Sequence, residues 1–187
     1  TWDKEKDSMR DIQEYKTNNN SICSGQVLFK DYPFDEALVV VKEMGDDIAL
    51  QLSRKKKKAA GITLGVGMAG RSGGCGRHMS YSFPSPTQND LAFRDIAARL
   101  FVSMVGKDEY VRRFMISLSG IVDDNDPVQL DLFLDKEESK KRESIQKAIL
   151  SIKDTYGKNA ILKGMDYEEG ATQRERNVQI GGHKSGV

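Results

Sequence analysis

Apolar residues recur along the chain with two different periods, and this pattern predicts the secondary structure. The segment SICSGQVLF (21–29) is rich in β-branched and apolar residues, which predicts a strand with a bend at Gly25. From Asp35 the apolar residues recur every three or four positions, which predicts an amphipathic helix closed by the lysine run at 55–58. The members of this stripe are Ala37, Leu38, Val41, Met44, Ile48 and Leu52.

Alternation in the next two segments predicts a β-hairpin. In GITLGVGMA (61–69) and GRHMSYSFP (76–84) every second residue is large and apolar, and the glycine-rich GRSGGCG between them suits a turn. A second helix is expected from about Asp90, and YVRRFMISLSGIV (110–122) is expected to be the last strand. The predicted order is β-α-β-β-α-β, an α+β fold with a four-stranded sheet and both helices on one face.

The face of the predicted sheet that the helices leave open carries small and hydroxyl-bearing residues. Its predicted members are Thr63, Gly65, Gly67, His78, Ser80, Ser82, Arg113 and Ser117. Such a surface lets hydroxyls and backbone amides come close to phosphate oxygens, which holds a protein on a duplex without reading its sequence. A merely solvated face is the alternative. Glycines at 65 and 67 weaken a strand and therefore favour close approach of a ligand.

The net charge of +1 conceals an uneven distribution. Residues 54–113 carry 12 basic and 4 acidic side chains, a net charge of +8, whereas the segments on either side are acidic. A local excess of this kind is typical of a surface that meets phosphates. For the run RKKKK (54–58) alone, a solvated helix end is the alternative, because cations also suit the helix dipole. Asp46 and Asp47, on the first predicted helix, are expected to be solvated.

No motif in the sequence completes a catalytic or metal site. The segment GVGMAG (65–70) matches a dinucleotide fingerprint, but a turn and a strand follow it instead of a helix. Asp123, Asp124 and Asp126 lack the glycine and the distal glutamate of a calcium loop, so they indicate a charged linker. Two cysteines and two histidines are too few and too scattered for a zinc cluster or for a nucleophile with its base. We expect no metal, no cofactor and no catalysis from this chain alone.

Neither a membrane span nor a secretion signal is recognisable. The sequence has no apolar run of about 18 residues and begins TWDKEKDSMRD, which is polar throughout. A soluble, cytoplasmic protein without a membrane partner is therefore expected.

An apolar pentapeptide, QLDLF (129–133), interrupts a strongly polar stretch after the last predicted strand. A short apolar segment in a polar linker either folds back onto its own domain or docks into a pocket of another protein. Further along, apolar residues again recur at helical spacing and stop at Gly157. This second stripe comprises Ile145, Ala148, Ile149, Ile152 and Tyr156.

Several segments together resemble the C-terminal half of Y-family translesion DNA polymerases, in the UmuC-like branch that includes UV-damage repair and ImpB/MucB/SamB proteins. The segments are SICSGQVLFKDY, GITLGVGMA with its glycine-rich turn, VRRFMISLSGI, QLDLF and RNVQIGGHKSG. In that family the β-α-β-β-α-β unit is the little finger, which lies along duplex DNA. QLDLF looks like the pentapeptide by which bacterial polymerases bind the β sliding clamp. The palm, with the acidic residues that hold magnesium, and the fingers would lie upstream of Thr1.

The resemblance implies a division of the chain and a set of binding residues. Residues 1–20 would be the end of the thumb or a tether, 21–123 the little finger, 124–135 a linker with the clamp-binding motif, and 136–187 a helix and tail. The clamp-binding residues would be Gln129, Leu130, Asp131, Leu132 and Phe133. The expected DNA contacts are Arg54, Lys55, Lys56, Lys57, Lys58, Thr63, Arg77, Ser80, Ser82, Arg112, Arg113 and Ser117. The chain would thus hold DNA and dock the clamp for a bacterial damage-bypass polymerase of the SOS response, whose magnesium lies elsewhere in the parent.

Two other classes share features with this sequence. An RNA-recognition domain has the same β-α-β-β-α-β order, but it stacks bases on exposed aromatics of its first and third strands. Here Tyr81 and Phe83 are expected to face inward and Phe29 to lie at a strand end. A small ferredoxin-like enzyme or regulatory domain is the other alternative, disfavoured by the lack of a catalytic set. The sequence gives no physical account of RNVQIGGHKSG (176–186).

Overall fold

The computed structural model describes residues 21–70, 76–124, 136–180 and 183–184. Six elements form the main unit, in the order β1 (Ser21–Tyr32), α2 (Phe34–Arg54), β2 (Lys57–Met68), β3 (Arg77–Thr87), α3 (Asp90–Met104) and β4 (Val111–Asp123). The predicted β-α-β-β-α-β order is therefore confirmed.

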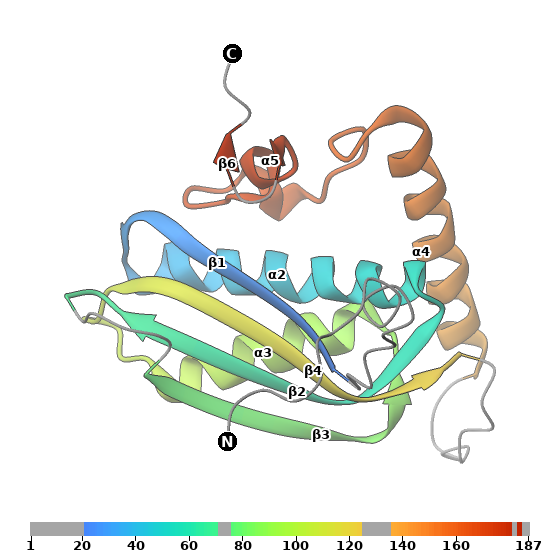
Figure 1. Cartoon of the computed structure of the whole chain (residues 1–187), viewed down its shortest axis with the longest axis horizontal. Coiled ribbons are helices and arrows are strands. Elements are labelled where there is room, and N and C mark those ends of the chain that lie inside the picture. Colours follow the sequence, from blue (N-terminus) through green and yellow to red (C-terminus); the bar gives the residue numbers. More distant parts are fainter. Residues whose placement is uncertain (1–20, 71–75, 125–135, 181–182, 185–187) are drawn as a thin grey trace, which may run out of the picture.

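The strands pair into one antiparallel sheet with the order β1-β4-β2-β3. Helices α2 and α3 lie together on one side of it, and no described helix covers the other side (Figure 1). This confirms the predicted α+β class. The order also puts the first and third strands at opposite edges of the sheet, which the sequence pattern alone did not reveal.

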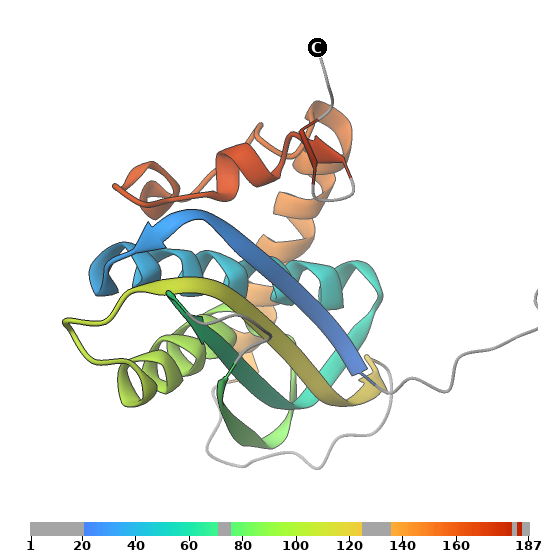
Figure 2. The ribbon, with the colours of Figure 1, turned by 60° about the vertical axis from the view of Figure 1, so that its left-hand side comes forward.

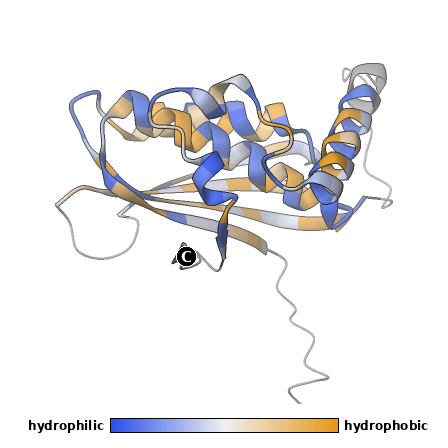
Figure 3. Cartoon of the chain, turned by 90° about the horizontal axis from the view of Figure 1, so that it is seen from above, coloured by the Kyte–Doolittle hydropathy of each residue, from blue (hydrophilic) through white to orange (hydrophobic). Residues whose placement is uncertain are grey.

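The core fills the space between the sheet and the two helices. The predicted inward residues of the central strands are almost fully buried, and the apolar stripes of α2 and α3 cover them. Figure 3 shows the helices as a layer over the sheet, with apolar residues in both layers. Aromatic rings link the layers, since Phe101 lies 5.1 Å from Phe34 and 5.9 Å from Phe114 between ring centroids. The alternation in the strands follows from a sheet that is covered on one face only.

Helices α2 and α3 approach each other closely at Gly45. A Cβ atom added there would lie 2.9 Å from the Cα of Arg94 and 3.2 Å from the carbonyl oxygen of Phe93. Helix α3 begins at a cap formed by Asn89, whose side-chain oxygen accepts hydrogen bonds from the backbone N–H groups of Leu91 and Ala92.

Two local predictions differ from the structure. Helix α2 ends at Arg54, and the lysine run does not simply close it, because Lys57 and Lys58 already belong to β2. The turn between α2 and β2 contains Lys56, whose φ is 53°. Strand β1 continues to Tyr32, and its register with β4 is interrupted after Val27 rather than at Gly25.

Beyond the main unit the chain returns to the helix side. Helix α4 (Lys136–Tyr156) ends before Gly157, which has a φ of 96°. The tail, defined as residues 157–180, contains η1 (Gly164–Tyr167), α5 (Gln173–Arg176) and β5 (Gln179–Ile180), and β5 pairs with β6 (His183–Lys184). Figure 2 shows the tail running along α2 and the edge strand β1. None of the described helices has the length and apolar composition needed to cross a membrane.

Candidate nucleic-acid interface

The strand register arranges the outward side chains of the sheet in four rows. Residues directly opposite each other on neighbouring strands point to the same face. The rows are Ser21, Ser119, Gly61 and Ser82; Cys23, Ser117, Thr63 and Ser80; Gly25, Met115, Gly65 and His78; and Val27, Arg113 and Gly67. These residues are called the open face below.

Most of the open face is smooth, because its side chains are short. In the second row the hydroxyls of Thr63 and Ser80 lie 2.8 Å apart. In the first row the Ser119 hydroxyl lies only 2.7 Å from where a Cβ of Gly61 would be, so the serine fills the space over the glycine. The glycines therefore do not simply leave bare backbone for a ligand. Ser119 covers Gly61 and the Arg113 side chain covers Gly67, so the first two rows present mainly hydroxyls.

Arg113 is a cation in the last row, at one end of the open face. Its side chain lies across Gly67, where an added Cβ would be 2.2 Å from its Cγ. It forms no ion pair with another described residue. Arg112 lies beside it, donates a hydrogen bond of 3.3 Å to the carbonyl oxygen of Phe29, and approaches Asp31 at 3.5 Å.

Most of the other predicted basic contacts are paired with acids. Lys57 and Lys58 bond to Asp123 and Asp124 at 2.6 and 2.8 Å, at the end of the sheet where β4 finishes. Arg54 pairs with Asp154 of α4. Lys55 and Lys56, in the turn after α2, have no ion pair with the described residues. The +8 charge of this region is thus partly neutralised within the fold.

Arg77 lies away from the open face, contrary to the expected interface. It is the register partner of Val66, whose side chain points to the helices. Its guanidinium donates two hydrogen bonds to Glu109, at 2.6 and 2.7 Å, and one to the carbonyl oxygen of Met104. We leave Arg77 out of the interface, because its donors tie the start of β3 to the end of α3.

The clamp-binding motif predicted at residues 129–133 lies outside the described residues. The residues before 125 and after 135 are described. Asp124 accepts a hydrogen bond from Gln88, and Gln146 of α4 donates one of 3.1 Å to the carbonyl oxygen of the same Gln88.

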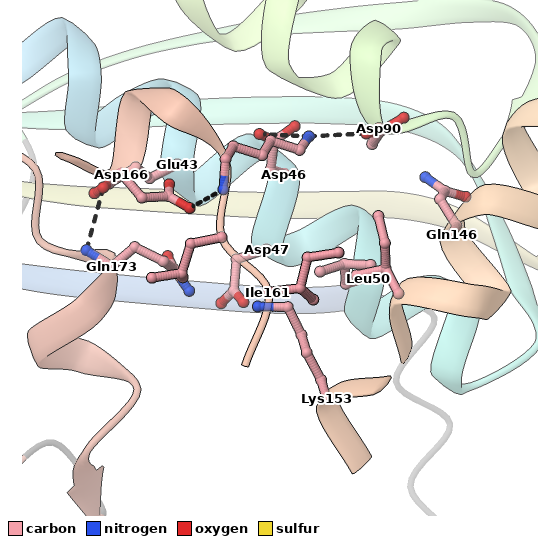
Figure 4. A pocket seen from close by; sticks show the side chains of 13 residues that line it. Glu43, Asp46, Asp47, Leu50, Asp90, Gln146, Lys153, Ile161, Asp166 and Gln173 are labelled. Atoms are coloured by element: carbon pink, nitrogen blue, oxygen red, sulfur yellow. Dashed lines mark hydrogen bonds and ion pairs between the residues drawn. The ribbon is translucent and has the colours of Figure 1, made fainter. Parts of the chain in front are cut away.

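The expectation that Asp46 and Asp47 are solvated is wrong. Asp46 is only 7% exposed and pairs with Lys163 of the tail at 2.8 Å, while Asp47 pairs with Arg176 at 3.1 Å. In Figure 4 the labelled Asp46 and Asp90 both connect by dashed lines to one amine, which belongs to Lys163. Burial raises the pKa of Asp46 to about 6, although Lys163 and Arg94 act in the opposite direction.

Glu43 binds the tail in a second way. Its carboxylate is 1% exposed and accepts hydrogen bonds from the backbone N–H and hydroxyl of Thr172 and from the backbone N–H of Gln173, at 2.9, 3.0 and 3.2 Å. Burial raises the pKa of Glu43, and these donors partly counter that effect. The partners lie about 130 residues away in the sequence, so no local pattern reveals them.

A small cavity of about 140 Å³ lies between α2, α4 and the tail. Leu50, Ile149, Ile161 and Leu162 supply apolar walls, and the acids just described lie at its rim (Figure 4). Within the part of the chain that the structure describes, no three His, Cys, Asp or Glu side chains gather as a metal site. The contacts of Glu43, Asp46 and Asp47 hold the tail against α2, which is a structural role.

The fold and its open face agree with a known family. The sequence model of the impB/mucB/samB family C-terminal domain matches residues 19–132. The chain belongs to this family. The match covers the whole β-α-β-β-α-β unit and confirms the resemblance to the little-finger region of UmuC-like Y-family polymerases.

One relative extends this similarity into the tail. The chain is 30% identical over 166 residues to UvrX of Bacillus subtilis (strain 168), a protein named for UV-damage repair. The alignment covers 88% of this chain and 39% of UvrX, so the chain spans well under half of that relative's length. Like the family model, this match places the chain among UmuC-like proteins.

Proposed function

We propose that this chain is the DNA-holding and clamp-docking portion of a UmuC-like translesion DNA polymerase. The observation that supports it most strongly is the open face, where hydroxyls and glycines line the central strands and Arg113, at one end, forms no ion pair with another described residue. Membership of the impB/mucB/samB family supports the same conclusion.

In this proposal the DNA backbone lies along the rows of the open face. Hydroxyls of Thr63, Ser80, Ser82 and Ser117 donate to phosphate oxygens, and Arg113 supplies charge. Contacts of this type fix the position of a duplex but carry no sequence information. Lys55 and Lys56 precede β2, at the end of the sheet opposite Arg113, and add positive charge there. The protein would act in the bacterial cytoplasm, where its DNA substrate lies.

Salt-dependent binding tests the DNA part of the proposal. Primer-template affinity of the chain should fall steeply with salt and be indifferent to sequence, with a slope of about −0.9 per neutralised phosphate. Arg113→Ala should weaken binding about fivefold and reduce the slope by about one. Arg99→Ala, an exposed arginine on α3, is the matched control and should leave binding unchanged. Binding that is absent at low salt, or insensitive to salt, would contradict the proposal.

The clamp part rests on the pentapeptide at 129–133. Leu132→Ala combined with Phe133→Ala should abolish binding to a bacterial β sliding clamp in calorimetry, because each buried side chain contributes roughly 1.5 to 3 kcal/mol. The melting temperature should barely change. Ile145→Ala, at an exposed position of α4, is the control. A large loss of stability with intact clamp binding would mean that the pentapeptide is part of the domain's own core.

We assign the polymerase chemistry, with its magnesium, to other parts of a longer parent protein. The described residues contain no carboxylate group placed to hold metals. The chain alone should add no nucleotide to a primer at any magnesium concentration, whereas the parent should extend primers. Extension by the pure chain would refute this assignment.

The RNA-recognition alternative is not favoured by the sheet order. Such a domain needs its first and third strands to present aromatics on one shared platform, but β1 and β3 are the two edges of this sheet. Tyr81 and Phe83 of β3 also turn to the helix side, where Phe83 packs 5.1 Å from Phe93 between ring centroids.

A further inference from the structure

One end of the open face differs chemically from the rest. Val27 is 64% exposed, Phe29 55% and Met115 37%. The first two rows, toward the other end, consist of serine, threonine, cysteine and glycine and are called the serine rows. Val27, Phe29 and Met115 are called the apolar patch. Arg112 and Arg113 lie beside it.

The backbone explains why these side chains point outward. Leu28 is 1% exposed and faces the helices, so its neighbours Val27 and Phe29 face the other side of the strand. Strand β1 is an edge of the sheet, and its regular pairing with β4 stops after Val27. Arg112 bridges this interruption with its hydrogen bond to the carbonyl oxygen of Phe29. Phe29 is thus held inside β1. The sequence-based expectation that it lies at a strand end is wrong.

The apolar patch cannot bind phosphate groups in the way proposed for the serine rows. Phosphate oxygens need donors and cations, which Val27, Phe29 and Met115 lack. An exposed aromatic ring next to arginines is the combination that binds single-stranded nucleic acid, because bases stack on the ring while the cations meet the backbone. Bases within a duplex are already stacked on each other and present no face to such a ring.

We infer that Phe29 stacks an unpaired base of a single-stranded segment that continues from the duplex held on the serine rows. This inference rests on the proposed DNA-binding function and assigns the two ends of the open face to different parts of one substrate. Val27 and Met115 would contact the same base or its sugar, and Arg112 and Arg113 would pair with the flanking phosphates. The positive charge beside the patch favours a nucleic acid over an apolar protein segment as the occupant.

Binding of two DNA forms tests the inference with the full chain. One probe is a duplex with a single-stranded overhang that carries 2-aminopurine, whose fluorescence falls on stacking, and the other is the same duplex with blunt ends. Phe29→Ala and Phe29→Leu should weaken binding of the overhang about tenfold and abolish the quenching, while blunt-duplex affinity stays constant. Phe29→Trp should retain both signals, since it keeps an aromatic face.

Tyr167→Ala is the matched control, because Tyr167 is 65% exposed but lies in the tail. It should change neither signal. Equal overhang binding by wild type and Phe29→Leu, or an equal loss on both probes, would overturn the stacking role and favour a protein contact for the patch. If the wild type bound neither probe, the proposed DNA-binding function itself would fail, so the two failures are distinguishable.

Discussion

The two sides of this domain use polar residues in opposite ways. On the open face most polar groups are small and neutral, and Arg113 forms no ion pair with another described residue. On the outer side of α2, the carboxylates of Glu43, Asp46 and Asp47 are buried or half-buried, and each is paired with the tail. Polar groups that are satisfied within the fold stabilise it, whereas groups without internal partners remain available to a ligand.

This contrast implies that stability and DNA binding can be changed separately. Substitutions on the helix side should lower stability and leave DNA affinity intact, and substitutions on the open face should do the reverse. The following variants test that separation.

The largest effect is expected where α2 meets α3. Gly45→Val would push a side chain against the backbone of Arg94 and Phe93, which has no room to shift without separating the helices. We expect a loss of roughly 3 kcal/mol of unfolding free energy, measured by urea denaturation. Gly164→Val, at a position with no atoms within 4 Å of the added Cβ, is the control and should cost little. Equal stability of the two variants would show that the helices are not closely packed.

A smaller loss is expected when the tail loses its buried anchor. Glu43→Ala would leave three donors of Thr172 and Gln173 without an acceptor, unless the tail detaches and exposes them to water. We expect a cost of roughly 2 to 3 kcal/mol and faster proteolysis within the tail. Glu169→Ala, at an exposed tail position, should behave like the wild type. Protection of the tail in the Glu43 variant would contradict its role as the anchor.

Asp46 should make stability depend on pH. Its pKa is raised from 3.8 to about 6 in the folded state, so the folded protein binds a proton that the unfolded chain has released. The associated stability is fully present below about pH 3.8 and is lost as the pH rises through about 6. Relative to Asp46→Asn, the wild type should therefore lose about 2 kcal/mol between pH 4 and pH 7 in urea unfolding. Asp95→Asn, at an exposed site on α3, should run parallel to the wild type.

The smallest effect is expected on the open face and concerns binding alone. Gly67→Ala places a methyl group where the Arg113 side chain now lies, so the arginine must move. DNA affinity should fall about fivefold, or about 1 kcal/mol, with an unchanged melting temperature. Gly76→Ala meets no atom within 4 Å and is the control. An unchanged affinity would show that the position of Arg113 does not matter for the duplex.

Much of the fold could be predicted because its two layers impose simple periods on the sequence. Ile62, Leu64 and Val66 alternate with smaller residues because only one face of the sheet is covered. The stripes of α2 and α3 follow from the same cause. The strand order could not be predicted, since the same alternation suits several pairings of four strands.

The face of the sheet on which a candidate residue lies could be predicted from the alternation of side chains. Pairings between residues far apart in the sequence could not. Thr63, Ser80 and Arg113 were placed correctly by period two. Arg77 was included for its charge, although the same alternation that sends His78 and Ser80 outward puts Arg77 on the helix side, opposite Val66. The pairing of Asp46 with Lys163 left no local signal, as two charged side chains on separate segments look solvated in a sequence.

Gln88 connects the described residues that come before and after the pentapeptide QLDLF. Its side chain donates a hydrogen bond to Asp124, and its carbonyl oxygen accepts one from Gln146 of α4, so the helix that follows residues 125–135 is bonded to the same residue as the end of β4 that precedes them. Whatever path these residues take, Leu132 is four residues from Lys136 and cannot lie more than about 14 Å from it. If a clamp binds at Leu132, as proposed, chain length alone keeps it within that reach of the start of α4. Inserting glycine and serine between residues 133 and 136 would raise this upper limit without changing the residues of the motif or of α4.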